Sequence, residues 1–226
     1  MAGQMVEFQS NGGTAQGYLS MPDSGRGPGV VVIQEWWGLV PHIKDVADRF
    51  AREGFVALAP DLYHGEVARS PDEAGKLMMA LNIAQAERDL RGAVEYLSSH
   101  EATEGEKVGT VGFCMGGVLS LYAASKNTQV GACVVFYGIH PKVAPDFDNL
   151  RAPVLGLYAE RDKSVPPAAV RALEEKLREH GKQVETHIYP GTDHAFFNDT
   201  RPEVYNADAA ADAWRRTTEF FREHLK

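Results

Sequence analysis

One stretch near the middle of the chain limits the possible folds more than any other. Residues 108–113, Val-Gly-Thr-Val-Gly-Phe, form the short apolar run that is typical of a buried strand. Cys114, Met115 and two glycines follow, and residues 118–124 then have the composition of an apolar helix. Glycines on both sides of Cys114 suit a sharp corner, because larger side chains would clash where strand and helix nearly touch. The stretch therefore predicts a nucleophile elbow with cysteine as the reactive residue.

The two cysteines have different surroundings. The helix expected after Cys114 would present unpaired N–H groups and a positive dipole end to the thiol, which favours a thiolate or an oxyanion. The alternative for Cys114 is a buried structural thiol, since free cysteines are among the most buried residues. Cys133 lies inside an apolar run instead. We therefore expect neither a disulfide framework nor thiol redox chemistry.

Length and charge narrow the class of protein. A chain of 226 residues fits one large domain, and we expect a single domain over residues 1–226. The formal net charge of −8 argues against nucleic acid or an anionic membrane as a partner. The apolar runs are far shorter than the ~20 residues of a spanning helix, and residues 1–8 show no signal-peptide pattern. The expectation is a cytoplasmic protein that acts on a small molecule, as a monomer or small homo-oligomer.

Elsewhere, apolar strands alternate with amphipathic helices. Residues 5–20 predict a hairpin with Asn11-Gly12-Gly13 as its turn. Further strands are expected at residues 29–34, 55–59, 108–113, 131–137, 152–158 and 184–189. Helical periodicity lies between residues 41 and 54, 83 and 97, 170 and 181, and 210 and 225, and Ser70 to Glu73 has the pattern of a capping box. This order predicts an α/β fold with a doubly wound, mostly parallel sheet, helices on both faces and a hairpin at one edge.

A polar residue follows each of several predicted strands. These residues are Glu35, Asp61, Cys114, Asp162 and His194. In open α/β sheets ligands bind beyond the carboxyl ends of the strands, so we expect these side chains to gather at one edge. The order of Cys114, Asp162 and His194 along the chain is the nucleophile–acid–base order of an α/β-hydrolase.

A triad of this kind assigns a role to each side chain. A cysteine attacks as thiolate, His194 would carry the proton, and Asp162 would fix the tautomer of the ring. Asp162 is the better partner than Asp193, because adjacent residues rarely point at the same group. The alternatives are a surface-loop histidine and an aspartate that caps a helix or turn. The oxyanion would be held by the backbone N–H groups of Met115 and Trp36.

Glu35 is an unusual end to a wholly apolar strand. We expect it to be buried close to Cys114, either as a structural carboxylate bonded to backbone N–H groups or an arginine, or as a second base for the thiol. Trp36 and Trp37 are expected to be packing residues. One of them, at the rim of a pocket, would also contact substrate. The seven histidines other than His194 show no paired spacing, so we expect no metal and no cofactor.

Together these motifs resemble the dienelactone hydrolase family of α/β-hydrolases, the carboxymethylenebutenolidases, over essentially the whole chain. The matching stretches are Gln34-Glu35-Trp-Trp-Gly, Ala59-Pro-Asp-Leu-Tyr63, Gly112-Phe-Cys-Met-Gly-Gly117, the Asp162 loop and Gly191-Thr-Asp-His194-Ala-Phe. The resemblance implies the α/β-hydrolase fold and a triad of Cys114, Asp162 and His194. It also implies that Glu35 interacts with the cysteine and helps to generate the thiolate when substrate enters.

The sequence departs from this family at positions that bind substrate. Namesake enzymes hold the carboxylate of their lactone with two arginines, and His64 and Asn198 stand at those positions here. The candidate substrate-binding residues are Trp37, Tyr63, His64, Arg69, Phe196 and Asn198.

The predicted function is the hydrolysis of a small carboxylic ester or lactone, less anionic than dienelactone, through an acyl-enzyme on Cys114. A thioesterase or acyltransferase with the same triad is the first alternative, and a non-catalytic ligand-binding homologue is the second.

Overall fold

The computed structural model describes residues 3–10, 12–138 and 140–226. Within these residues one sheet has the strand order β1-β2-β4-β3-β5-β6-β7-β8. The strands are β1 (Gln4–Ser10), β2 (Gly13–Ser20), β3 (Gly27–Ile33), β4 (Val56–Pro60), β5 (Thr103–Phe113), β6 (Val130–Phe136), β7 (Val154–Ala159) and β8 (Val184–Tyr189). β1 pairs with β2, and β2 with β4, in antiparallel fashion, whereas β4, β3, β5, β6, β7 and β8 are parallel to one another. The predicted mostly parallel sheet with an edge hairpin is confirmed, although Asn11 of the expected turn lies outside the described residues.

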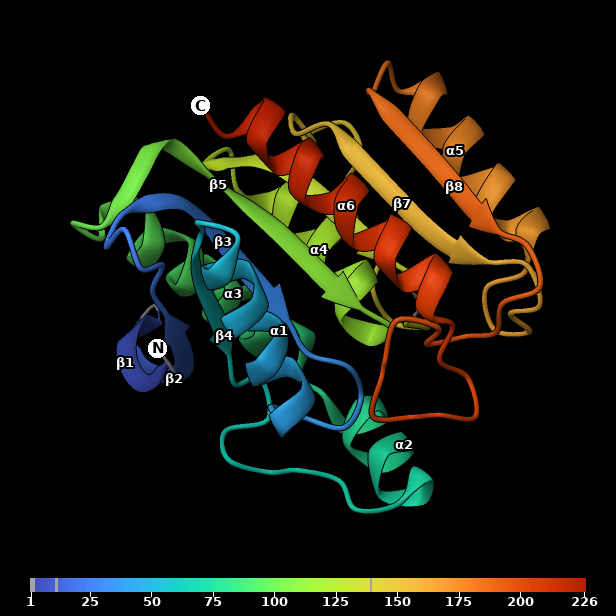
Figure 1. The fold of residues 1–226 in the computed structure, drawn as a ribbon, viewed down its shortest axis with the longest axis horizontal. Coiled ribbons are helices and arrows are strands. Elements are labelled where there is room, and N and C mark those ends of the chain that lie inside the picture. The colour runs from blue at the N-terminus through green and yellow to red at the C-terminus, as the bar shows by residue number, and fades with distance from the viewer. Residues whose placement is uncertain (1–2, 11, 139) are drawn as a thin grey trace.

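Helices cover both faces of this sheet, as predicted. They are α1 (Pro41–Arg52), α2 (Pro71–Ala80), α3 (Ile83–Ser99), α4 (Met115–Lys126), α5 (Pro167–Glu179) and α6 (Ala207–His224). In Figure 1, α1 and α6 lie in front of the sheet and α3 and α4 lie behind it. α2 belongs to neither layer and lies beyond the carboxyl ends of the strands.

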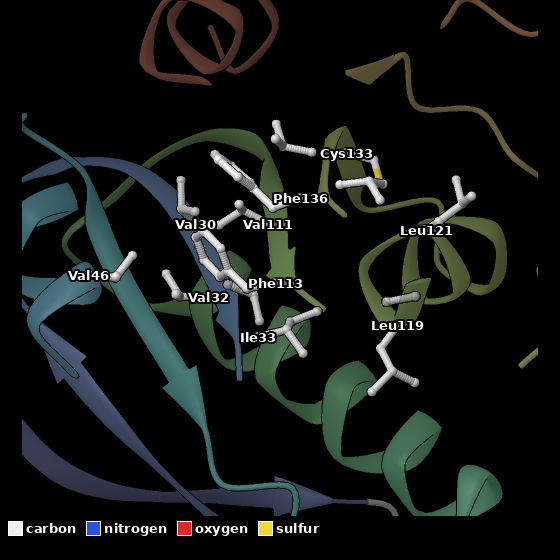
Figure 2. Close-up of a cluster of buried hydrophobic side chains, with 14 of the residues drawn as sticks. Val30, Val32, Ile33, Val46, Val111, Phe113, Leu119, Leu121, Cys133 and Phe136 are labelled. Carbon is white, nitrogen blue, oxygen red and sulfur yellow. The ribbon is translucent and has the colours of Figure 1, made fainter. Parts of the chain in front are cut away.

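The core lies between the central strands and these two layers. Figure 2 shows Val46 of α1 and Leu119 of α4 on opposite sides of side chains from β3, β5 and β6. Phe113 and Phe136 pack against each other in this core with tilted rings whose centroids are 4.6 Å apart. Cys133 is fully buried among them and is hydrogen-bonded to Ser120, 3.4 Å away, which fits a structural thiol.

β5 begins earlier than its apolar run indicates. Residues 103–107 are polar and mostly exposed, yet Thr103 and Glu104 pair with the start of β3 before a register shift in the middle of the ladder. The apolar pattern reveals only the buried half of the strand, because exposed strand residues do not need apolar side chains. The carboxyl end of β5, which leads to Cys114, is where the sequence placed it.

Candidate active site

The corner after β5 holds Cys114 in a conformation that few residues adopt. Its φ of 54° and ψ of −120° are those of a strained turn, and strain of this kind typically costs about 1–3 kcal/mol. A Cβ on Gly112 would lie 1.8 Å from the carbonyl oxygen of Gly116, and one on Gly116 would lie 2.4 Å from that of Ile33. Both glycines are therefore required for the close approach of strand and helix. The result is a thiol held at the N-terminus of α4, with 8% of the residue exposed.

His194 and Asp162 meet beside this thiol. His194 Nδ1 lies 2.6 Å from Asp162 Oδ2, and the other oxygen of the carboxylate accepts hydrogen bonds from the N–H groups of Ser164 and Val165. Asp162 is thereby fixed by its own loop. Although burial opposes it, hydrogen bonds from His194, Val165 and Ser164 lower the pKa of Asp162, so the carboxylate is ionised beside the ring. Asp193, the adjacent acid, instead bonds Arg161 at the surface.

The charge state of His194 follows from its two partners. Burial alone would lower the pKa of His194, but hydrogen bonds with Asp162 and Cys114 and the charges of both raise it to about 10. Beside a Cys114 thiolate the ring is thus an imidazolium at neutral pH, bonded to Asp162 through Nδ1, with Nε2 left for the sulfur. Such a cation next to Cys114, together with the N-terminus of α4, favours the thiolate.

Glu35 is held from behind by Asn198. Both residues are almost fully buried, at 1% and 2% exposure, and Asn198 Nδ2 donates to Glu35 Oε2 at 2.8 Å. The amide cannot be reversed, because its oxygen accepts hydrogen bonds from the N–H and the hydroxyl of Thr200 at 3.1 and 2.6 Å. The Asn198 side chain therefore donates to Oε2 of Glu35, which must be an acceptor in this contact. The other carboxylate oxygen, Oε1, is left for another partner.

A second buried group, His42, lies in the same region at the start of α1. Its Nδ1 is 3.4 Å from Asp199 Oδ1, and neither ring nitrogen makes a hydrogen bond within the described chain. Burial lowers the pKa of His42 against the opposing charges of Glu35 and Asp199, so the ring is neutral. Asp199 also forms an ion pair with Arg49 of α1. These contacts dock the loop that carries His194 onto α1.

Glu35, Cys114 and His194 all line one cavity of about 190 Å³. Four of its lining residues were predicted from the sequence: Glu35, Trp36, Cys114 and His194. Others were missed: Met78, Pro141, Ser164, Ala195 and Arg201. Arg201 adds a cation, whose guanidinium also bonds Glu203 at 2.8 Å. Met78 lies on α2, whereas the other four lie in loops, where no periodicity marks a residue. For Arg201, its nearness to His194 along the chain was the one available signal.

The other candidate substrate-binding residues do not line this cavity. His64 lines a second cavity, and its Nε2 is 3.1 Å from Oδ2 of the buried Asp89. Tyr63 lines that cavity as well, and its hydroxyl donates to Met115 Sδ at 3.3 Å. Phe196 is fully buried and packs against Tyr137. Arg69 is exposed near α2. Trp37 packs edge-on against Trp36.

The cavity also contains backbone donors. The N–H groups of Met115 and Trp36 bond no other group among the described residues. Met115 opens α4, where the first N–H groups of a helix have no intrahelical acceptor. Both donors stand next to residues that line the cavity and can hold an oxyanion that develops on a substrate carbonyl.

Two features are absent from the described residues. No group of three or more histidine, cysteine, aspartate or glutamate side chains there is arranged to hold a metal ion. None of the helices in that part of the chain has the length and apolar character needed to cross a membrane.

Comparisons with known proteins agree with one another. The model of the dienelactone hydrolase family matches residues 15–225. The chain is 42% identical to "Protein usf" of Aquifex pyrophilus over 230 residues, covering 99% of both chains. It is 38% identical to a protein of Aquifex aeolicus named "Putative carboxymethylenebutenolidase", over 99% of this chain and 100% of that one.

A solved structure extends this similarity to the fold. The crystal structure of the "Putative Dienelactone Hydrolase" of Klebsiella pneumoniae superposes with a TM-score of 0.86 at 30% sequence identity. The match covers 99% of this chain and 100% of that one.

Proposed function

This chain belongs to the dienelactone hydrolase family, hydrolases that act on esters or lactones, and we propose that it cleaves a small carboxylic ester or lactone through an acyl-enzyme on Cys114. The observation that carries the proposal is one cavity that brings together the strained Cys114, Glu35 and a His194 bonded to Asp162. Cys114 is the nucleophile, Glu35 is a base for its thiol, and His194 with Asp162 is the acid–base pair.

Acylation begins with proton transfer from the Cys114 thiol. Glu35, which lines the same cavity as Cys114, accepts this proton: Asn198 holds its Oε2 at 2.8 Å, and Oε1 takes the thiol proton. His194 keeps its own proton beside the thiolate that forms, because the hydrogen bonds and charges of Asp162 and Cys114 raise its pKa to about 10 against the effect of burial. The thiolate attacks the carbonyl carbon, and the N–H groups of Met115 and Trp36 bind the oxyanion. As the C–O bond to the leaving group breaks, His194 gives that oxygen its proton.

Deacylation reverses these roles. The neutral His194 accepts a proton from water, and the hydroxide formed attacks the thioester carbonyl. Collapse of the second tetrahedral intermediate releases the acid and the Cys114 thiolate, which recovers its proton from Glu35. Each proton is returned, and the net reaction consumes one ester and one water.

The volume and charge of the cavity indicate the size and charge of the substrate. About 190 Å³ suits a small acyl group, and Arg201 is the cation that reaches this cavity in place of the two arginines of the namesake enzymes. An arginine–carboxylate contact typically contributes about 1.5–3 kcal/mol. With one such contact instead of two, and with Glu203 competing for it, we expect neutral esters to be turned over more efficiently than dienelactone.

The test is a panel of p-nitrophenyl esters, thioesters and lactones with the wild type and Cys114→Ala. We expect ester turnover that Cys114→Ala abolishes, and a kcat/KM for dienelactone below that of a neutral ester of similar size. A Cys114→Ala protein with full esterase activity would refute the nucleophile. Preferred turnover of thioesters would assign the chain to the thioesterases, and binding without turnover of any ester would identify a non-catalytic homologue.

A further inference from the structure

α2 is packed differently from the other helices. It lies beyond the strand ends, outside both layers (Figure 1), and Ala74 is its only buried residue. In α4, by contrast, nine of twelve residues are buried. No strand or helix of the described chain packs extensively against α2. Apart from Ala74, the contacts of α2 with the core come from Leu77 and Met78, which are only partly buried.

The N-terminus of α2 is stabilised by its own residues. Ser70 Oγ accepts a hydrogen bond from the N–H of Glu73, and the carboxylate of Glu73 accepts one from the N–H of Arg69 at 2.7 Å. Pro71, at the first helical position, fixes the backbone in the helical range. With its start capped locally, α2 can remain helical while it moves as a unit.

The C-terminus of α2 is held by another segment. The last carbonyl groups of a helix lack intrahelical donors and attract cations, and the last turn of α2 has no basic residue. Lys142 Nζ donates to the carbonyl oxygen of Met79 at 2.6 Å, and His140 Nε2 lies 3.1 Å from that of Met78. His140 Nδ1 accepts from the N–H of Lys142 at 3.1 Å, so the ring proton is on Nε2 and donates to Met78. We call His140 and Lys142 the latch.

The latch lies beside the catalytic cavity. Met78 on α2 and Pro141 between the two latch residues both line that cavity. On the other side of the last turn, Leu77, Ala80 and Leu81 line the second cavity, of about 180 Å³. The last turn of α2 thus separates two empty volumes. Movement into the second cavity would enlarge the first without opening the core.

We propose that α2 is a lid and that the latch of His140 and Lys142 determines how large a substrate the enzyme accepts. In the closed state, Met78 limits the acyl group to the catalytic cavity. A bulkier ester binds when the latch releases and α2 moves into the second cavity. This proposal rests on the proposed function, because it takes the cavity around Cys114 as the place where the ester binds.

The test compares Lys142→Met with Lys76→Met. Both remove an ammonium from an exposed lysine, but Lys76 lies on α2 outside the latch and makes no hydrogen bond to the described residues. For p-nitrophenyl octanoate, Lys142→Met should raise kcat/KM by about tenfold, because loss of a charged hydrogen bond increases the open population by roughly that factor. For p-nitrophenyl acetate, both variants should match the wild type. An unchanged ratio of octanoate to acetate in Lys142→Met would overturn the proposal.

Alkylation of Cys114 tests the lid without any ester. In Lys142→Met, Cys114 should react with a bulky N-substituted maleimide about tenfold faster than in Lys76→Met, because α2 moves as an intact helix and opens the cavity that Cys114 lines. The small reagent iodoacetamide should react equally fast with both variants. Equal rates with the bulky maleimide would contradict the latch even if ester hydrolysis were established. Faster maleimide labelling in a protein that hydrolyses no ester would support the latch and refute the proposed function.

Discussion

Asn198→Asp changes one atom in the pair that holds Glu35. One oxygen of the new carboxylate can keep both contacts with Thr200 that the amide oxygen makes now. The other replaces the nitrogen that lies 2.8 Å from Glu35 Oε2. The substitution thus replaces a hydrogen-bond donor with an acceptor and leaves the surrounding contacts unchanged. Its effect can therefore be assigned to the negative charge that it introduces.

The magnitude follows from that distance. Two unit charges 2.8 Å apart repel by about 6 kcal/mol at an effective dielectric constant of about 20. A pKa change of one unit corresponds to about 1.36 kcal/mol, so the two carboxylates should share a proton at neutral pH. Glu35 would then be unable to accept the thiol proton, and acylation should fall by about 10²-fold at pH 7. As pH rises and the shared proton leaves, the rate should recover.

Single-turnover release of p-nitrophenol between pH 6 and pH 10 measures the acylation rate, and urea unfolding measures stability. A carboxyl that binds its proton more tightly in the folded state contributes stability that is lost as pH rises through its folded pKa. The free energy of unfolding of Asn198→Asp should therefore fall relative to the wild type as pH increases. Asn149→Asp is a matched control, because Asn149 donates to Asp146 at 2.7 Å on the exposed surface. Wild-type acylation at pH 7 in Asn198→Asp would refute this reasoning.

Four further predictions concern the elbow, the triad and the second cysteine. Gly116→Ala should lose several kcal/mol in urea unfolding, because its Cβ would lie 2.4 Å from backbone carbonyl oxygens of β3 and of the residue after it; wild-type stability would contradict this close approach. Asp162→Asn should lower kcat by about 10⁴-fold and, by NMR titration, lower the pKa of His194 from about 10. In the wild type, the stabilising effect of protonated His194 should be complete below pH ~6.5 and lost as pH rises through about 10, and a flat stability profile over that interval would argue against the raised pKa. Iodoacetamide should label Cys114 alone, because burial raises the pKa of Cys133 to about 11 and that side chain is 0% exposed; peptide mapping that finds label on Cys133 in folded protein would contradict this.

The sequence was most informative where local pattern and function coincide. Apolar runs located the parallel strands, because strands buried on both faces need apolar side chains throughout. The glycines around Cys114 predicted the corner, since the packing of β5 against α4 leaves no room for a Cβ. The order of Cys114, Asp162 and His194 was read from the chain, and the structure places these residues together because parallel strands end at one edge.

Side-chain direction in the loops could not be predicted in this way. Asn198 was expected to face substrate but lies behind Glu35, and His64 turns toward Asp89 in another cavity. Arg201 reaches the catalytic cavity from a loop without periodicity. The latch residues His140 and Lys142 bond the end of α2, some sixty residues earlier in the chain. Each of these placements depends on contacts between distant segments, which a single sequence does not reveal.

The central claim is that Cys114 carries the acyl group, and trapping that intermediate tests it most directly. Wild-type protein and Cys114→Ser would be mixed with p-nitrophenyl acetate, quenched in acid within the first turnover, digested and analysed by mass spectrometry. We predict one acetyl group on the peptide that contains Cys114 of the wild type, formed at the rate of p-nitrophenol release. Acetyl on another residue at that rate, or full turnover by wild type with no acyl-peptide at any quench time, would contradict the account.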